Sequence, residues 1–596
     1  MGGFWAELKR RNVVKVGIAY CAAGWLAIQV ASVLFPMFGA PAWILKVVTT
    51  LVILGLPLAL VFAWAFELTP QGLKRSEDVR PDVSTTRNTG RALNFLIIGV
   101  LAVALGLFAL DRFVWDAAPS PASSDAAGAS VEVAKPAASG THSSIAVLPF
   151  VNMSNDPEQE YFSDGIAEEV MSALSRFKAL KVAARTSAFS FKGKHADLRE
   201  VGLALNVGTV LEGSVRKSGD HLRITAQLND VATGYQLWSE TYDRKLTDIF
   251  AIQDDITTRI VSALQVHLDE KVASTTPPQL DPEAYQIVLR GRFHWNERSP
   301  EGLAKAAELL QEATRRAPQY APAFSALADV YLTQYDYGLL SWEESTVRAR
   351  AAATKALELD EDSAAAHTSL AHILLHEWQW QAAEQHFQHA IELDPSYTLA
   401  LHWYALCLTA LGRADEAVKT MQRASQLDPL SVRINADLGM ALVVAGKYED
   451  AVAQVGRALE LKPGAGGPLW IRGMALEQLG RFDAAEIDMK AALASMSGYE
   501  AVKGSLGHLY AVSGRPAEAR ALLSELTRQA GDTEVAFFAA LICAGLNDAD
   551  AALTWLERAV DERSGSVRYL KIDPRLAGLR HEPRFRQLME RVGLPP

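Results

Sequence analysis

The chain contains only three cysteines in 596 residues, too few to build a disulfide framework. Cys21 lies in an apolar stretch, and Cys407 and Cys543 lie in stretches with helical periodicity, so we expect buried, unreactive thiols. The chain also has fewer basic than acidic residues, with 58 lysines and arginines against 69 aspartates and glutamates, so its net charge is -11. A protein that binds nucleic acid needs the opposite balance, so the composition argues against that class of partner.

The sequence also lacks a constellation of residues typical of an enzyme. Residues Gly208–Gly213 have the glycine spacing of a phosphate-binding loop but continue without the lysine that such a loop needs. Asp164 and Glu168 belong to a carboxylate cluster, which at the start of a helix needs no catalytic explanation. We therefore predict no catalytic residue, no cofactor and no metal site, and a protein that is not an enzyme.

The longest regular feature is a repeat of 34 residues between Ala364 and Leu526. Apolar residues recur at helical spacing within each unit, a glycine ends the first helix, and a proline follows the second. A fixed period of this size predicts one pair of helices that is copied and stacked. Four series keep the interval: Gly412, Gly446, Gly480 and Gly514; Pro395, Pro429 and Pro463; Ala383, Ala417, Ala451, Ala485 and Ala519; and Ala390, Ala424, Ala458 and Ala492.

This pattern resembles the tetratricopeptide repeat (TPR), and the resemblance implies an all-α solenoid of about eight units over residues 280–562. About nine extra residues around Tyr335–Trp342 are expected to form a loop between the two helices of one unit. Tyr569–Arg575 and Glu582–Phe585 resemble the terminal cap of such arrays. We therefore expect residues 563–596 to cover the end of the stack with a polar surface.

The first 115 residues contain three apolar stretches, at about 16–35, 44–66 and 93–113. Each is long enough, or nearly so, to cross a hydrocarbon core of ~30 Å, so we predict three transmembrane helices. Basic residues precede the first stretch and lie between the second and third, which places the N-terminus and Glu67–Arg91 in the cytoplasm. Everything after the third helix would then lie outside the inner membrane, in the bacterial periplasm. Residues 116–143, rich in Ala, Ser and Pro, are expected to form a flexible linker.

Small residues mark the first apolar stretch as a surface for helix packing. Four alanines at a spacing of four allow close approach of another helix, which could be the second stretch or a second copy of the chain. Residues 4–12 and 63–74 resemble a module at the N-terminus of many bacterial TPR membrane proteins. The alanines are Ala19, Ala23, Ala27 and Ala31.

Residues 144–272 have the pattern of a small α/β domain. Alternating polar and apolar residues in His221–Asp230 predict a half-buried hairpin strand, and a helix is expected to begin at Ser163 or Asp164. Further strands are expected at Ile145–Val151, Leu180–Ala184, Val207–Lys217 and Tyr235–Tyr242, and further helices near Leu198–Leu205 and Ile249–Leu264.

Three segments of this region, 145–150, 162–169 and 237–242, resemble the TolB N-terminal-like (FlgO-like) domain. That domain occurs in periplasmic and outer-membrane-associated proteins. It also occurs beside TPR arrays in proteins that carry a class III adenylate cyclase or a winged-helix regulator. The resemblance implies a partner-binding module without catalytic residues.

The repeat register predicts a concave groove that is apolar and nearly free of lysine and arginine. Such a groove suits an apolar segment of a partner protein and lacks the carboxylate clamp of some chaperone TPR domains. The alternative that one of the protein's own helices fills the groove stays open. Trp470 is expected to be a binding hot spot that supports no neighbouring repeat. The predicted groove residues are His372, His376, His402, Leu406, Met440, Val443, Val444, Trp470, Met474 and His508.

Two of these histidines have the i, i+4 spacing of metal ligands. His372 and His376 lack a clear carboxylate or cysteine to complete a site, so we expect a polar patch.

Together these features predict a membrane-anchored periplasmic scaffold for protein–protein interactions. The alternative is a sensory or signalling arm, related to TPR-linked adenylate cyclases or transcriptional regulators. Such an arm would act through a partner, because only 25 residues, Glu67–Arg91, lie in the cytoplasm between predicted helices.

Overall fold

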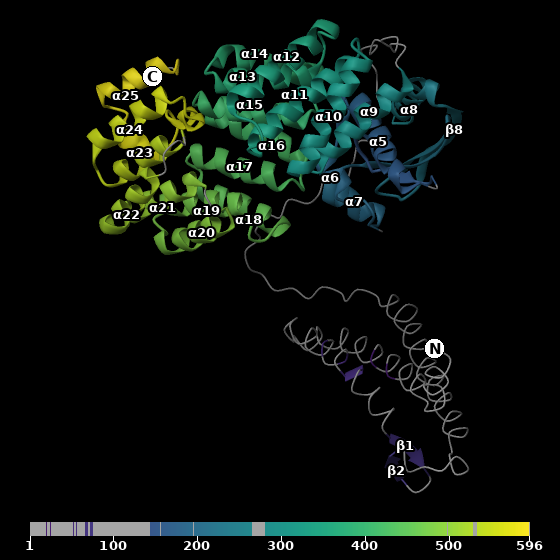
Figure 1. The fold of residues 1–596 in the computed structure, drawn as a ribbon, viewed down its shortest axis with the longest axis horizontal. Helices are drawn as coiled ribbons and strands as arrows, with labels where there is room; N and C mark the ends of the chain where they lie inside the picture. The colour runs from purple at the N-terminus through teal and green to yellow at the C-terminus, as the bar shows by residue number, and fades with distance from the viewer. Residues whose placement is uncertain are drawn as a thin grey trace, which may run out of the picture. The chain divides into compact units, whose positions relative to one another are not determined.

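The computed structural model of the chain divides into two units, residues 1–134 and 135–596, which we consider separately (Figure 1). In the second unit it describes residues 143–264 except 155 and 195, 281–496, 499–528 and 533–594. In the first unit it describes six single positions and two short strands.

The strands of the first unit form a hairpin that the sequence did not predict. β1 (Phe66–Thr69) pairs antiparallel with β2 (Gly72–Arg75), and Thr69 lies opposite Gly72. The Tyr20 hydroxyl donates a hydrogen bond to the Val52 carbonyl at 3.0 Å, so the first and second apolar stretches are in contact.

No helix among the residues described here is both long and apolar enough to span a membrane. The predicted spans at 16–35, 44–66 and 93–113, the alanine stripe and the linker at 116–143 lie outside the described residues, apart from single positions.

The second unit begins with a mixed six-stranded sheet over residues 144–245. Its order is β5-β3-β6-β7-β8, and the short β4 pairs with β6. β3 runs parallel to β5 and β6, whereas β6, β7 and β8 form an antiparallel meander. The strands are β3 (Ser144–Val147), β4 (Val151–Asn152), β5 (Lys181–Val182), β6 (Thr209–Ser218), β7 (His221–Asp230) and β8 (Gln236–Lys245).

Helices α5 and α8 pack against each other and against the sheet. α5 begins at Glu160, so the expectation that Ser163 or Asp164 starts this helix is wrong; both residues lie inside it and are buried. The 3₁₀ turn η2 (Pro157–Gln159) precedes α5, and the Asp156 side chain caps that turn by accepting from the Glu158 N–H. The helices of the domain are α5 (Glu160–Ser175), α6 (Arg185–Phe189), α7 (Leu198–Leu205) and α8 (Ile249–Ala263), with a 3₁₀ turn η3 (Leu246–Asp248) before α8.

Helices α9 to α24 form eight consecutive pairs, which stack into an all-α solenoid. The pairs are α9 (Pro282–Asn296) with α10 (Pro300–Arg316), α11 (Ala321–Asp336) with α12 (Trp342–Leu359), α13 (Ala364–His376) with α14 (Trp380–Leu393), α15 (Thr398–Ala410) with α16 (Ala414–Leu427), α17 (Val432–Val444) with α18 (Tyr448–Leu461), α19 (Gly466–Gln478) with α20 (Phe482–Ser495), α21 (Glu500–Val512) with α22 (Pro516–Thr527), and α23 (Val535–Gly545) with α24 (Ala549–Asp561).

The periodic residues of the sequence hold the pairs together. Gly446 has φ +70°, in the left-handed region, and the Lys447 N–H returns to the Leu442 carbonyl to close the helix end. The equivalent glycines of the other units also have positive φ. All nine periodic alanines are completely buried, because a larger side chain would separate the two helices.

The insertion around Tyr335–Trp342 forms a shorter loop than expected. α11 and α12 have 16 and 18 residues, against 13 and 14 in α13 and α14, so the extra residues mainly lengthen the two helices.

The α/β domain and the array share a core. Tyr285 and Leu289 of α9 are buried among the apolar residues of the α/β domain. The Ser175 hydroxyl donates to Asp394 at 2.7 Å, and Ser187 hydrogen-bonds Asp428, the residue that occupies the same position one repeat later. The domain therefore docks on the loops of two successive repeats.

The C-terminal segment, residues 564–594, lies beside the last helix pair in Figure 1 and also contacts α13 and α14, earlier in the array. The Trp380 indole N–H at the start of α14 donates to the Val592 carbonyl at 2.7 Å. The segment packs on the last helix pair, through η5 on α23 and α25 on α24, and it also carries buried apolar residues into the array's main hydrophobic core. It comprises η4 (Gly565–Tyr569), η5 (Pro574–Leu579) and α25 (Pro583–Arg591), and its buried residues include Leu570, Leu576, Leu579, Phe585, Leu588 and Met589.

Candidate functional site

The predicted groove residues lie on the first helices of successive pairs, α13, α15, α17, α19 and α21. We call the surface that these residues line the inner surface. Four of them are almost fully enclosed: His402, Val443, Met474 and His508 are 3–6% exposed. The other six, His372, His376, Leu406, Met440, Val444 and Trp470, are half-buried.

His402 is engaged with the next repeat. Its Nε2 lies 2.7 Å from the Asp437 carboxylate, which also accepts from Arg433 Nε at 2.7 Å. Burial alone would raise the pKa of the Asp437 carboxyl, but the Arg433 charge and the His402 hydrogen bond outweigh it and hold that pKa below its usual range. The carboxylate therefore stays ionised between an arginine and an imidazole.

Trp470 contacts the neighbouring repeat, so the expectation that it supports none is wrong, whereas its expected role as a binding hot spot stays a prediction. Its indole N–H donates to the Ser505 hydroxyl on α21 at 2.8 Å. Arg575 from the C-terminal segment donates to the same oxygen at 2.8 Å. On the same helices, His508 Nδ1 lies 2.9 Å from the buried Glu477 carboxylate. These polar contacts join α19, α21 and the C-terminal segment.

His372 and His376 lie in a cluster of aromatic rings. His372 stacks on Trp403 with ring centroids 4.0 Å apart, and His376 lies 4.5 Å from the Trp342 ring. Burial lowers the pKa of His372 to about 3, and the positive charge of Arg568 acts in the same direction. Both imidazoles are therefore neutral at pH 7.

No group of three or more histidine, cysteine or acidic side chains in the described ranges could hold a metal ion. The positively charged side chain of Arg568 lies next to the two histidines, with its Nη1 at 3.4 Å from His376 Nε2.

The inner surface carries arginines that sequence reasoning missed. Arg433 projects from the first turn of α17, and Arg568 and Arg575 come from the C-terminal segment. The expectation of a groove nearly free of arginine is therefore wrong. A segment of the protein's own chain fills part of the groove, which is the alternative that the sequence left open. No local signal reveals Arg568, because its partner His376 lies 192 residues earlier.

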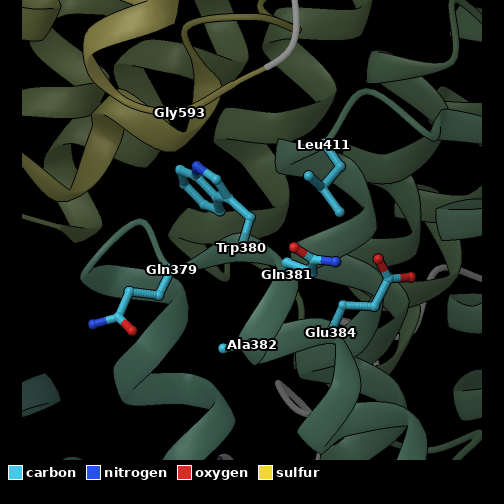
Figure 2. A pocket seen from close by; sticks show the side chains of 7 residues that line it. All are labelled: Gln379, Trp380, Gln381, Ala382, Glu384, Leu411 and Gly593. Atoms are coloured by element: carbon cyan, nitrogen blue, oxygen red, sulfur yellow. The ribbon is translucent and has the colours of Figure 1, made fainter.

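A pocket of ≈ 470 Å³ opens where α14, the end of α15 and the C-terminal segment meet (Figure 2). Figure 2 shows the Trp380 indole directed toward the segment that carries Gly593. Glu384 lines the same pocket, and its carboxylate already accepts hydrogen bonds from the Tyr404 hydroxyl at 2.9 Å and from Arg413. The lining residues are Gln379, Trp380, Gln381, Ala382, Glu384, Leu411 and Gly593.

Models of the tetratricopeptide repeat match this part of the chain, at residues 374–434, 436–500, 476–541 and 533–558. A tetratricopeptide repeat protein of known structure from Parabacteroides merdae is 14% identical and covers 45% of this chain and 98% of its own, with a TM-score of 0.33. PilF of Pseudomonas aeruginosa is 22% identical over 35% of this chain and 90% of its own, with a TM-score of 0.29.

Curated relatives match over part of their length. "Putative adenylate cyclase 3" of Rhizobium meliloti is 39% identical over 286 residues, which are 46% of this chain and 41% of the relative. The transcriptional regulator HilA of Salmonella typhimurium is 26% identical over 139 residues, 23% of this chain and 25% of the relative. The chain thus spans less than half the length of either relative. The matches to repeat models, together with the stacked helix pairs, identify residues 374–558 as tetratricopeptide repeats.

Proposed function

We propose that this protein is a membrane-anchored scaffold that holds a partner protein on the inner surface of its repeat array. The observation that carries the proposal is the array itself, because tetratricopeptide repeats bind protein partners and are typically not enzymes. Leu406, Met440 and Val444 are half-buried, so part of each apolar side chain remains exposed, although Leu406 and Met440 also pack against the array's core. An apolar segment of a partner could therefore cover them, which would remove apolar surface from water.

Three transmembrane helices at 16–35, 44–66 and 93–113 would anchor the scaffold in a bacterial inner membrane. The contact between Tyr20 and Val52 is consistent with packing of the first helix on the second. The charge pattern supports a cytoplasmic N-terminus and periplasmic domains after residue 143. A reporter that works only in the periplasm should be active when fused after Ser143 and silent at Pro81. The reverse pattern would overturn this topology.

The α/β domain would be a second partner-binding module of the TolB N-terminal-like type. Its support is the strand order, with a parallel β5-β3-β6 core extended by the β6–β8 meander, together with the sequence resemblance. The domain docks on the array through Ser175 and Ser187, so a partner held by one would lie close to the other.

Co-purification from detergent-solubilised membranes tests the scaffold. Met440→Gln places a polar group on the inner surface and should reduce partner capture by about 30-fold if Met440 is a hot spot worth about 2 kcal/mol. Arg457→Gln on the exposed side of α18 is the matched control and should capture as wild type. Thermal melting must show that both variants remain folded. Equal capture by all three proteins would place the partner elsewhere, on the α/β domain first.

A second candidate is a signalling arm, favoured by the partial similarity to a protein named as an adenylate cyclase and to a transcriptional regulator. Such an arm needs the segment Glu67–Arg91 to pass a signal to a cytoplasmic partner, whereas the scaffold does not. Replacing that segment with an unrelated basic loop should leave partner capture intact in either case. Loss of a cellular output after this replacement would support the signalling arm.

A further inference from the structure

β8 (Gln236–Lys245) is the last strand of the six-stranded sheet, and among the described residues only one of its two edges is paired. Its neighbour is β7, with His221 opposite Lys245 and Leu228 opposite Trp238. Figure 1 shows β8 at the margin of the second unit, at the end opposite the C-terminus. The strand is ten residues long and contains neither proline nor glycine, so its outer edge offers a regular row of backbone groups to another strand.

The pairing with β7 determines which residues direct their N–H and C=O groups to this outer edge. The Leu246 N–H donates to the carbonyl of Asp220, the residue opposite it, at 2.7 Å. Hydrogen-bonded positions alternate along an antiparallel pair, so Arg244, Tyr242 and Glu240 also direct their backbone groups to β7. The residues between them direct theirs to the outer edge, and these residues are Ser239, Thr241, Asp243 and Lys245. One of the outward groups, the Asp243 carbonyl, accepts from the exposed Arg244 side chain at 3.0 Å, which a second strand would displace.

The side chains of β8 are complementary to those of a second β8 that runs antiparallel to it. When Tyr242 lies on the two-fold axis, Glu240 of each copy faces Arg244 of the other. Opposite charges directly across two strands stabilise their pairing. Glu240 has room for this contact, because its side chain is 37% exposed and the nearest cation, Arg259, is 3.9 Å away. Arg244 is exposed as well.

Other registers of the two strands are less favourable. A shift by one residue would oppose outward backbone groups with groups that already bind β7. A shift by two residues places Asp243 opposite Asp243 in one direction, and Glu240 opposite Tyr242 in the other. A shift by four residues in that second direction places Glu240 opposite Glu240. Like charges directly opposite each other destabilise a strand pair, so the register centred on Tyr242 is the one that the charges favour.

We propose that two copies of this protein pair through the outer edge of β8, antiparallel and with Tyr242 on the two-fold axis. The interface is isologous, because each copy contributes the same residues and the two sheets become one continuous sheet. Pairing satisfies the outward backbone groups of Ser239, Thr241, Asp243 and Lys245 on both copies. The inference goes beyond the scaffold function and does not depend on it, and it places two repeat arrays in one assembly.

Cysteine cross-linking of the full chain in detergent tests the pairing and its register. The double variant Ser239→Cys/Lys245→Cys should form a disulfide-linked dimer under mild oxidation, because these positions face each other across the axis. Within one chain they are about 20 Å apart along the strand and cannot form a disulfide. Ser239→Cys/Asp243→Cys, which places the second cysteine out of register, should cross-link at least fivefold less. Wild-type protein treated in the same way measures the background of the native cysteines.

Two further changes in the Ser239→Cys/Lys245→Cys protein separate pairing of the edge from chance collision. Thr241→Pro should lower the cross-linked fraction at least tenfold, because it removes an N–H that points to the outer edge and none that binds β7. Thr241→Ala is the matched control: it loses the same hydroxyl contact with Thr225 at 3.2 Å, keeps the N–H and should cross-link as its parent does. Arg244→Glu should also reduce cross-linking, and adding Glu240→Lys should restore it, which decides the question if Thr241→Pro does not fold.

Three results would overturn the proposal: no cross-linked dimer at any protein concentration, equal cross-linking after Thr241→Pro, or preferential cross-linking of Ser239→Cys/Asp243→Cys. Protection of β8 from hydrogen exchange by a co-purified partner, while the cysteines stay unlinked, would assign the edge to a strand of that partner and would also overturn pairing with a second copy.

Discussion

Trp380→Phe tests whether the C-terminal segment is an integral part of the array. The change removes the indole N–H that donates to Val592 and leaves a buried carbonyl without its partner. An unsatisfied buried acceptor costs about 1–3 kcal/mol, and we take about 2 kcal/mol here. Because this contact joins the segment to α14, the loss should appear as easier local opening of residues 583–594.

Hydrogen exchange measured by mass spectrometry provides the assay. A loss of about 2 kcal/mol corresponds to about 30-fold faster exchange in peptides of α25. Trp295→Phe is the matched control, because it removes an indole hydrogen bond to Thr333 at 2.9 Å in the first helix pairs. That control should leave α25 unchanged. Unchanged exchange of α25 in Trp380→Phe would refute the idea that this contact holds the segment.

Three further predictions concern the array. Gly446→Val should destabilise the folded array by about 1–2 kcal/mol, because it forces a β-branched residue to φ +70°. Gly456→Ala, inside α18, should stabilise the array by up to about 1 kcal/mol, because alanine favours a helix more than glycine does. In thermal melts the first variant should lower the melting temperature and the second should raise it. Trp470→Phe and Ser505→Ala should show a coupling energy of about 0.5–1.5 kcal/mol in a double-mutant cycle, and additive effects would mean that the hydrogen bond contributes nothing. Folding lowers the pKa of His372 from 6.5 to about 3. Below pH 6.5 this side chain therefore binds a proton in the unfolded protein but not in the folded one, and the free energy of unfolding falls as the pH falls. At pH 5 the loss of unfolding free energy amounts to about 2 kcal/mol, which denaturant unfolding should measure. His372→Gln should remove this part of the pH dependence of stability.

The repeat architecture was predictable because its signals are local. Gly446 ends a helix by its own backbone freedom, and Ala451 and Ala458 permit close helix packing by their own size. The strand His221–Asp230 was equally predictable from the sequence, because alternate side chains of a strand face opposite sides of the sheet. Such features require no knowledge of what lies far away in the sequence.

The candidate site was only partly predictable. Position in the repeat brought the groove residues to one surface, but their partners depend on contacts between distant segments. Arg568 reaches His376 from 192 residues away, and Arg575 reaches Ser505 from 70 residues away. One signal was available: Phe585, Leu588 and Met589 have the spacing of an amphipathic helix, which indicates a segment that packs its apolar face on the array.

Docking of the α/β domain on the array was also beyond sequence reasoning. Asp394 and Asp428 are 34 residues apart and looked like ordinary residues before the prolines of successive repeats. Each accepts a hydrogen bond from a serine of the α/β domain, more than 200 residues earlier. Nothing in the sequence around either serine distinguishes it from a surface residue.

Hydrogen exchange of the purified complex with its co-purified partner tests the central claim most directly. If the inner surface holds the partner, binding should slow exchange in α13, α15, α17 and η4, and should leave the outer helices α16 and α18 as they are in the free protein. Protection confined to the outer helices, or no protection anywhere in residues 281–594, would contradict a scaffold that works through the inner surface of its repeat array.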